Sequence, residues 1–202
     1  MRWRTLTLIL TLWVVVFTVS LSAHTNTRYL VTQFGASDCG PAALATLLHY
    51  YLNIPTTAEE MTRLTKPHRQ TGTSLLALEE AATAKGCAAD SFRMSLDTLQ
   101  EQLTTYPIPL IVRTLNPEPH FSVLLGMERD YVYLADPAIG NTLLRKQAFL
   151  RRWYLPGTQE GLVFIATRPD RVHATHRARV LQELAQQLRN LETKRLPHTF
   201  RR

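Results

Sequence analysis

Cys39 is the residue whose surroundings most favour nucleophilic chemistry. Apolar residues follow it at helical spacing, at Leu44, Leu47, Leu48 and Tyr51. We therefore predict a buried helix over residues 39–52, with Ser37 or Asp38 as its cap. A thiol at a helix N-terminus lies among unpaired N–H groups and at the positive end of the helix dipole. Both effects favour the thiolate, which is the reactive form of cysteine.

A nucleophilic cysteine needs a base, and the base needs a group that orients it. His120 opens one predicted strand, and Asp136 closes the next one along the chain. Antiparallel strands joined by a short turn bring the start of one beside the end of the other, so we expect these two side chains to lie together. Gln33 precedes Cys39 by one short loop and can donate its amide N–H to an oxyanion. Gln33, Cys39, His120 and Asp136 thus form a candidate acyl-transfer site.

The spacing of these residues resembles a known family. The chain reads Gln-x4-Asp-Cys-Gly-x-Ala-x-Leu from Gln33, then His-Phe-x-Val from His120, then Asp-Pro from Asp136. This order is similar to that of the bacteriocin-processing, double-glycine-leader cysteine peptidases, over residues 29–167. We expect a standalone, exported member of the family.

The resemblance implies a papain-like fold and a role for each matched residue. Cys39 would be the nucleophile and His120 the general base and acid. Asp136 would orient the imidazole, and Gln33 would donate to the oxyanion. The same resemblance implies cleavage after a Gly-Gly-type site.

The remaining pattern predicts an α+β domain, with N-terminal helices packed on an antiparallel sheet. Helices are expected over residues 57–64, 74–85, 95–103 and 147–153, and strands over 87–94, 108–112 and 162–166. The first three of these helices are expected to be capped by Thr57, by Thr73 or Ser74, and by Ser95. Residues 137–141 are typical of a turn.

Two other residues offer alternatives at the site. Cys87 makes the cysteine count even, so a structural Cys39–Cys87 disulfide is an alternative to a catalytic Cys39. We interpret Cys87 instead as a buried core thiol. His68 is a competing base, but it lies in a polar loop without an acidic neighbour, and we interpret it as a solvated loop residue or a lip of the cleft.

Residues 1–23 are typical of a secretory signal. Arg2 and Arg4 precede an uncharged, mostly apolar run over residues 6–21, and small residues follow up to Ala23. We predict cleavage near Ala23, with an uncleaved N-terminal anchor as the alternative. The papain-like domain over residues 24–167 is therefore expected to be exported, and the bacterial resemblance implies the periplasm or beyond. An uncleaved N-terminal segment would hold the domain at the inner membrane.

Residues 168–202 carry most of the net positive charge of +7. Leucines at positions 181, 184, 188 and 191 predict a basic amphipathic helix. This tail can pack on its own domain, bind a partner protein or itself, or lie on an anionic membrane. Nucleic acid fits poorly because the basic stretch lacks interleaved aromatic residues.

We predict a cysteine endopeptidase that acts on a peptide or protein and needs no cofactor. The sequence contains no His-Glu-x-x-His motif and no paired Cys-x-x-Cys, so no metal site is expected. The alternative from another class is a non-catalytic papain-like binding module of an export or surface-assembly system.

Overall fold

The computed structural model describes residues 27–106, 108–115 and 117–168, together with Gln182, Gln186 and Arg189. The signal or anchor predicted for residues 1–23 lies outside the described residues, as does nearly all of the tail predicted for 168–202. Within the described ranges, no helix is long and apolar enough to cross a membrane.

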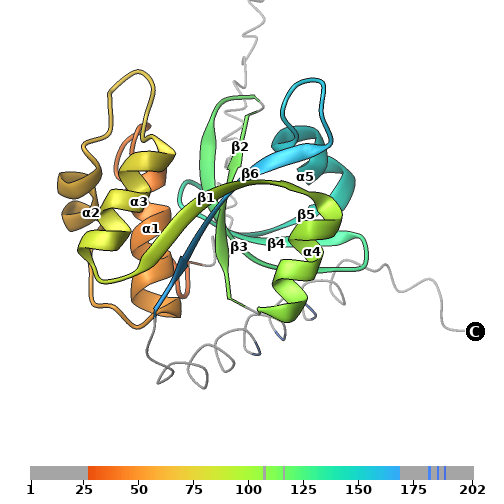
Figure 1. Ribbon diagram of the computed structural model, residues 1–202, viewed down its shortest axis with the longest axis horizontal. Helices are drawn as coiled ribbons and strands as arrows, with labels where there is room; N and C mark the ends of the chain where they lie inside the picture. Colours follow the sequence, from red (N-terminus) through yellow and green to blue (C-terminus); the bar gives the residue numbers. More distant parts are fainter. Residues whose placement is uncertain are drawn as a thin grey trace, which may run out of the picture.

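The described chain folds as helices packed on both faces of one antiparallel sheet (Figure 1). The helices are α1 (Cys39–Thr46), η1 (Leu47–Tyr51), α2 (Ala58–Thr65), α3 (Leu75–Ala84), α4 (Leu96–Thr105) and α5 (Lys146–Trp153). The strands are β1 (Ala88–Ser95), β2 (Leu110–Thr114), β3 (His120–Glu128), β4 (Tyr131–Asp136), β5 (Gly140–Arg145) and β6 (Glu160–Thr167). Their order in the sheet is β1-β6-β2-β3-β4-β5, which confirms the predicted α+β class.

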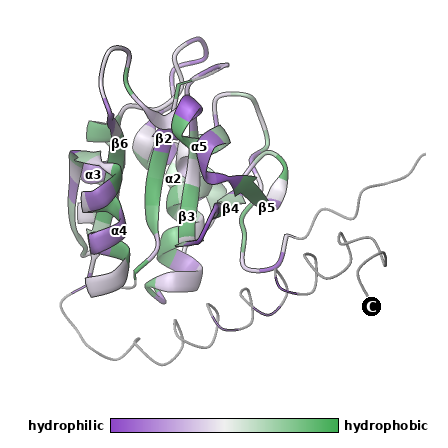
Figure 2. Cartoon of the chain, turned by 90° about the vertical axis from the view of Figure 1, so that its right-hand side faces the viewer, coloured by the Kyte–Doolittle hydropathy of each residue, from purple (hydrophilic) through white to green (hydrophobic). Residues whose placement is uncertain are grey.

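Alternation along the central strands separates two apolar cores. Ile111 and Val123 face α1, α2 and α3, whereas Val112 and Leu124 face α4 and α5. Figure 2 shows these hydrophobic stretches in β2, β3 and β6. The sheet is therefore covered on both faces. The core on the α1 side, which we call the first apolar core, fixes the position of the sheet relative to α1.

The predicted helix after Cys39 exists but changes type before its end. It is α-helical to Thr46 and continues as a π-helix over Leu47–Tyr51. The fully buried Thr46 donates to the carbonyl of Ala42 (2.8 Å) and accepts the N–H of Val31 (2.9 Å). The latter bond ties the segment before the nucleophile to the side of its helix.

Three predicted caps are confirmed and one is wrong. Thr57, Ser74 and Ser95 each accept an N–H from the first turn of the helix that they begin. Asp38 is the N-cap residue of α1 but makes no side-chain bond to that helix. Its carboxylate instead accepts the N–H of Gly35 (3.0 Å), which stabilises the preceding loop.

The sheet holds one strand more than the sequence predicted. The expected turn over residues 137–141 is shorter, because β5 begins at Gly140, which pairs with Asp136. The resulting tight β4–β5 connection places Pro137 and Ala138 directly beside the end of β4.

Candidate active site

Cys39 is the first residue of α1 and is 5% exposed. The helix carrying it packs on β3 through the first apolar core. Since neither Ser37 nor Asp38 caps α1 through its side chain, the start of the helix differs from the prediction. The N–H of Gly40 lies close enough to stabilise the Cys39 thiolate by a hydrogen bond.

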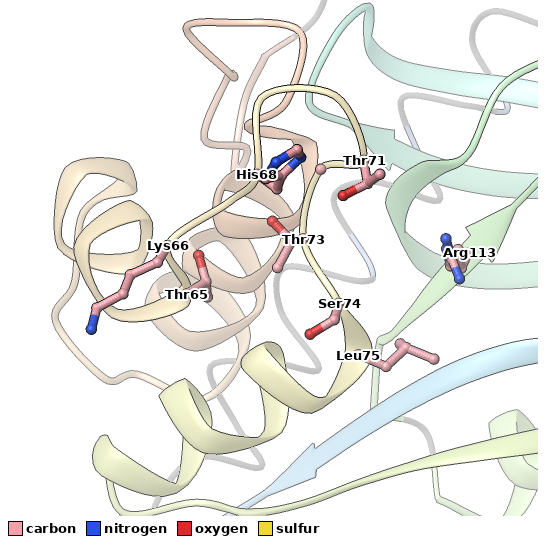
Figure 3. A pocket seen from close by; sticks show the side chains of 9 residues that line it. Thr65, Lys66, His68, Thr71, Thr73, Ser74, Leu75 and Arg113 are labelled. Carbon is pink, nitrogen blue, oxygen red and sulfur yellow. The ribbon is translucent and has the colours of Figure 1, made fainter.

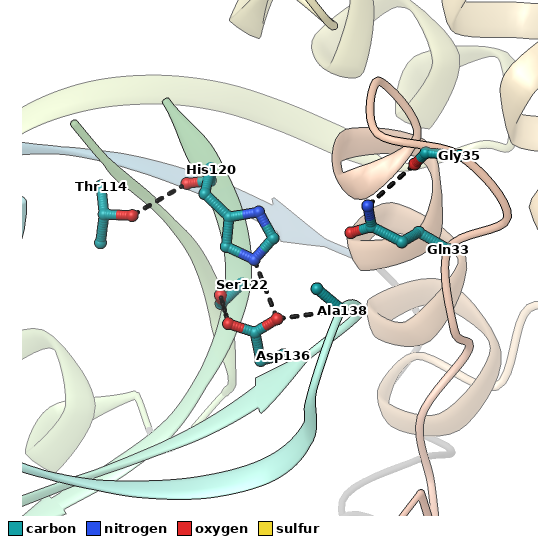
Figure 4. A network of polar contacts seen from close by, with 7 residues as sticks. All are labelled: Gln33, Gly35, Thr114, His120, Ser122, Asp136 and Ala138. Atoms are coloured by element: carbon teal, nitrogen blue, oxygen red, sulfur yellow. Dashed lines mark hydrogen bonds and ion pairs between the residues drawn. The ribbon is translucent and has the colours of Figure 1, made fainter. Parts of the chain in front are cut away.

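His120 and Asp136 lie side by side, as predicted from their positions at facing ends of two adjacent antiparallel strands. His120 is the first residue of β3 and Asp136 the last of β4, and the two strands pair in antiparallel register. The imidazole Nε2 lies 2.9 Å from Asp136 Oδ1 (Figure 4). The strand ends thus position the base against its carboxylate without any loop residue between them.

The carboxylate of Asp136 is held by two further donors. Ser122 Oγ donates to Oδ2 (3.1 Å), and the N–H of Ala138 donates to Oδ1 (2.9 Å). Burial at 8% exposure raises the pKa of Asp136, but the bonds from His120, Ala138 and Ser122 together lower it below its usual value. The sequence analysis missed Ser122. Its position two residues after His120 places it on the same face of β3, and this is the signal that could have identified it.

Cys39 lies close enough to the same imidazole for the two groups to interact. Because Nε2 faces Asp136, the nitrogen available to the thiol is Nδ1. Burial raises the pKa of the Cys39 thiol, but the hydrogen bond and charge of His120 and the N–H of Phe121 outweigh it, so this pKa is lowered.

The pKa of the His120 imidazole shifts in the opposite direction. Burial lowers the pKa of His120, but hydrogen bonds to Asp136 and Cys39 and their negative charges raise it to about 9. A lowered thiol pKa beside a raised imidazole pKa favours the thiolate–imidazolium pair at neutral pH. The arrangement can therefore supply both a nucleophile and a proton donor.

Gln33 lies at the edge of the same site. Its backbone N–H donates to the carbonyl of Pro137 (3.0 Å), and its side-chain Nε2 donates to the carbonyl of Gly35 (2.8 Å). Its Oε1 is buried without a hydrogen-bond partner. An amide nitrogen carries two N–H donors, and the bond to Gly35 uses one of them. The predicted donation to an oxyanion stays a prediction.

A cavity of about 380 Å³ opens between Gln33 and His120. Its wall includes Asp136, Ile139 and Arg152. We call it the His120-side pocket. It gives the imidazole access to a bound molecule on the side of the ring away from the first apolar core.

The structure does not form the alternative disulfide. Cys39 and Cys87 are both unpaired and buried. Burial raises the pKa of the Cys87 thiol, which fits the prediction of an inert core residue. His68 is exposed, and its Nδ1 accepts the N–H of Gln70 (3.2 Å). Over the residues described, no cluster of three or more His, Cys, Asp or Glu side chains could hold a metal ion.

Comparison with known proteins agrees with this geometry. A model of the peptidase C39 family matches residues 27–157. The chain belongs to this family. It is therefore a cysteine peptidase, and the matched range contains every residue of the candidate site.

Proteins of similar sequence occur in several organisms. An uncharacterized protein of Methanothermobacter thermautotrophicus is 30% identical over 74% of this chain and 95% of its own length. The probable functional amyloid protease FapD of Pseudomonas fluorescens is 32% identical over 67% of this chain, and the matched region covers 58% of the length of FapD. The lactococcin-A transport/processing ATP-binding protein LcnC of Lactococcus lactis is 31% identical over 60% of this chain and 17% of LcnC.

Two solved C39-type structures share the fold. The peptidase domain of Streptococcus ComA, a bifunctional ABC transporter involved in quorum sensing, superposes with a TM-score of 0.57 at 25% identity, over 69% of this chain and 97% of that domain. A double-glycine-motif protease from an AMS/PCAT transporter was solved in complex with a leader peptide. It superposes with a TM-score of 0.57 at 26% identity, over 68% of this chain and 89% of that protease. The predicted papain-like peptidase fold is thus confirmed.

Proposed function

We propose that this C39 peptidase cleaves a double-glycine-type leader from a peptide or protein, with Cys39 as the nucleophile. The observation that carries the proposal is that His120 Nε2 lies 2.9 Å from Asp136 Oδ1 while Cys39 lies within reach of the same imidazole. A thiol of lowered pKa beside an imidazole of raised pKa is the arrangement that nucleophilic cysteine catalysis requires.

In the proposed reaction, each side chain of the site has its own role. The Cys39 thiolate attacks the scissile carbonyl carbon, and the new C–S bond places the charge on the carbonyl oxygen. The N–H of Cys39 and the side chain of Gln33 stabilise that oxyanion. When the C–N bond breaks, the His120 imidazolium donates its proton to the leaving amine. His120 then takes a proton from water, which hydrolyses the thioester and releases the thiol.

Asp136 acts on the imidazole and not on the substrate. Its bond to Nε2 leaves Nδ1 directed at Cys39, and its charge stabilises the imidazolium. Ser122 and Ala138 hold the carboxylate in turn. This second set of bonds supports a fixed imidazole orientation through both proton transfers.

The substrate class rests on the relatives. LcnC is named for transport and processing, FapD is named as a protease of functional amyloid, and one solved relative holds a leader peptide. We extend leader cleavage to this chain and place that activity outside the cytoplasm, because residues 1–23 have the pattern of a secretory signal. The N-terminal residue of protein recovered from the periplasm, read by mass spectrometry, tests cleavage near Ala23 against an uncleaved anchor.

Cleavage of paired peptides tests the function. One peptide carries Gly-Gly before the scissile bond, and its partner carries Leu in place of the second Gly. The proposal predicts cleavage of the first only, full loss in Cys39→Ala and retention in the matched control Cys87→Ala. Cleavage of both peptides would reject the Gly-Gly preference. No cleavage, together with slow alkylation of Cys39, would favour the non-catalytic binding module.

A further inference from the structure

A second cavity of about 380 Å³ lies between the α2–α3 loop and β2 (Figure 3). Lys66 and Arg113 supply its only fixed charges, and no carboxylate lines it. We call it the Arg113 pocket. Its walls therefore favour an anionic group over a cationic one.

Arg113 is half-buried, and none of the carboxylates that the structure describes pairs with it. Its Nε is buried without a hydrogen-bond partner, and across the described ranges its guanidinium makes no hydrogen bond or ion pair. The guanidinium stacks on the Phe121 ring at 5.7 Å from the ring centroid. This contact fixes the orientation of the side chain but leaves its donors unused. A partly desolvated cation without a counter-charge gains more from an anionic ligand than a solvated one does.

The Arg113 pocket is adjacent to the nucleophile. Thr73, one of its lining residues, packs on Gly40 so closely that a Cβ on Gly40 would lie 2.7 Å from the Cβ of Thr73. Phe121, under the guanidinium, has its backbone N–H close enough to Cys39 to lower the pKa of the thiol. One lining residue of the pocket thus packs on Gly40, and the ring beneath Arg113 belongs to a residue beside Cys39.

The two pockets lie towards opposite faces of the sheet. Arg113 pairs with Phe121 across β2 and β3, so both side chains share the face of the sheet that packs on α1. His120 precedes Phe121 and therefore points to the other face, towards the His120-side pocket. A peptide that crosses Cys39 from one pocket to the other would enter both.

Proton transfer fixes the direction of that peptide. His120 must protonate the leaving amine, so the residues after the scissile bond lie on the His120 side. The acyl half, which stays attached to Cys39, then extends over Gly40 towards Thr73 and Arg113. The residues before the scissile bond are therefore the ones that reach the guanidinium.

We propose that Arg113 is a specificity-determining residue that binds an acidic side chain on the acyl side of the scissile bond. The inference rests on the proposed peptidase function, since it assumes that His120 protonates the leaving group. A planar guanidinium held against an aromatic ring presents its N–H donors in the geometry that suits a carboxylate.

Binding to the inactive variant Cys39→Ala tests this assignment without any turnover. The probes are fluorescein-labelled peptides with Gly-Gly before the scissile bond. Glu or Gln is placed in turn at the third, fourth, fifth and sixth positions before that bond. We expect the Glu peptide to bind about tenfold more tightly than its Gln partner at one of these positions, with the difference shrinking as salt rises. Equal affinities at all four positions would overturn the proposal.

The variant Arg113→Met, in the same background, removes the charge and keeps an apolar stem against Phe121. It should abolish the preference for Glu, whereas Arg113→Lys should retain part of it. Arg145→Met is the matched control, because the Arg145 guanidinium also stacks on an aromatic ring, that of Tyr131, at 5.6 Å. A Glu preference that survives in Arg113→Met, or disappears equally in Arg145→Met, would reject Arg113 as its source.

Cleavage by the wild-type chain separates this proposal from the proposed function. If the Glu peptide binds selectively through Arg113 but no peptide is cleaved, the peptidase assignment fails and the recognition site stands. If peptides are cleaved after Gly-Gly with equal kcat/KM for Glu and Gln, the function stands and the role of Arg113 is rejected.

Discussion

Replacing Asp136 by Asn should slow the reaction of Cys39 without changing the size of the side chain. The carboxylate accepts hydrogen bonds from His120 Nε2, from the N–H of Ala138 and from Ser122 Oγ, at 2.9, 2.9 and 3.1 Å. An amide has only one oxygen for these donors and carries no charge. The substitution therefore removes the group that holds the imidazolium in place and stabilises its charge.

The pKa of His120 sets the size of the effect. It is raised from 6.5 to about 9, which at about 1.4 kcal/mol per pKa unit corresponds to about 3 kcal/mol in favour of the imidazolium. Asp136 shares this stabilisation with Cys39. If Asp136 supplies half, its loss lowers the pKa of His120 to roughly 8 and raises that of Cys39 in turn. The equilibrium between the thiolate–imidazolium pair and the neutral pair then shifts by about tenfold towards the neutral pair.

Iodoacetamide alkylation across pH 5 to 10, measured by peptide mass spectrometry, reports both cysteines in one sample. The two thiols are equally buried, so in the wild type Cys39 should react faster at neutral pH because its pKa is lowered, whereas the raised pKa of Cys87 should keep that thiol slow. In Asp136→Asn, the Cys39 profile should move to higher pH while that of Cys87 stays fixed. An unchanged Cys39 profile would refute the role of Asp136, and equal shifts in both would indicate a general loosening of the fold.

The same substitution should alter stability at acid pH. The pKa of Asp136 is lowered by folding, so its contribution is present above its unfolded value of 3.8 and is lost as pH falls through its folded pKa. The wild-type melting temperature should therefore fall more steeply below pH 4 than that of Asp136→Asn. Around pH 7 to 8, the opposite shifts of Cys39 and His120 cancel, because the folded ion pair and the unfolded neutral pair each bind one proton. If the melting temperature falls equally steeply below pH 4 in both proteins, the stabilising role of the Asp136 carboxylate is contradicted.

Two further substitutions test packing and hydrogen bonding through thermal unfolding. In Gly161→Ala, the new Cβ would lie 2.2 Å from the buried Trp153 ring, so we expect a loss of about 1–3 kcal/mol, and a neutral result would mean that the indole can move. Thr46→Val leaves the Val31 N–H without its acceptor and should cost about 1–3 kcal/mol, whereas Thr65→Val removes only a bond to a carbonyl in its own helix and should cost less. Equal losses in the two threonine variants would show that the Val31 bond contributes nothing.

The sequence predicted the placement of Cys39, His120 and Asp136 because each position is determined locally. A thiol before an apolar helical repeat lies at a helix start, and two residues at facing ends of a hairpin must be neighbours. The caps at Thr57, Ser74 and Ser95 were equally local. For these features, composition and periodicity in short windows were sufficient.

The features that were missed depend on tertiary contacts. Asp38 has the composition of a cap, but the loop before it competes for its carboxylate through the N–H of Gly35. The strand that begins at Gly140 is stabilised by pairing with β4, which no local pattern shows. The position of Ser122 two residues after His120 indicates a shared face of β3, but its bond to Asp136 also depends on how that carboxylate is oriented. The pocket at Arg113 likewise needs two distant segments, the α2–α3 loop and β2, to be brought together.

The bond between the Gln33 N–H and the Pro137 carbonyl connects the segment before the nucleophile to a turn far along the chain. Asn141 makes a parallel connection through its Nδ2 to the carbonyl of Arg28 (2.9 Å). The β4–β5 hairpin must therefore be synthesised before these two hydrogen bonds can form. Until then Cys39 has neither His120 beside it nor a fixed loop above it, and it behaves as an ordinary thiol. Under the proposed mechanism, an unfolded chain is therefore inactive until folding brings Cys39 and His120 together.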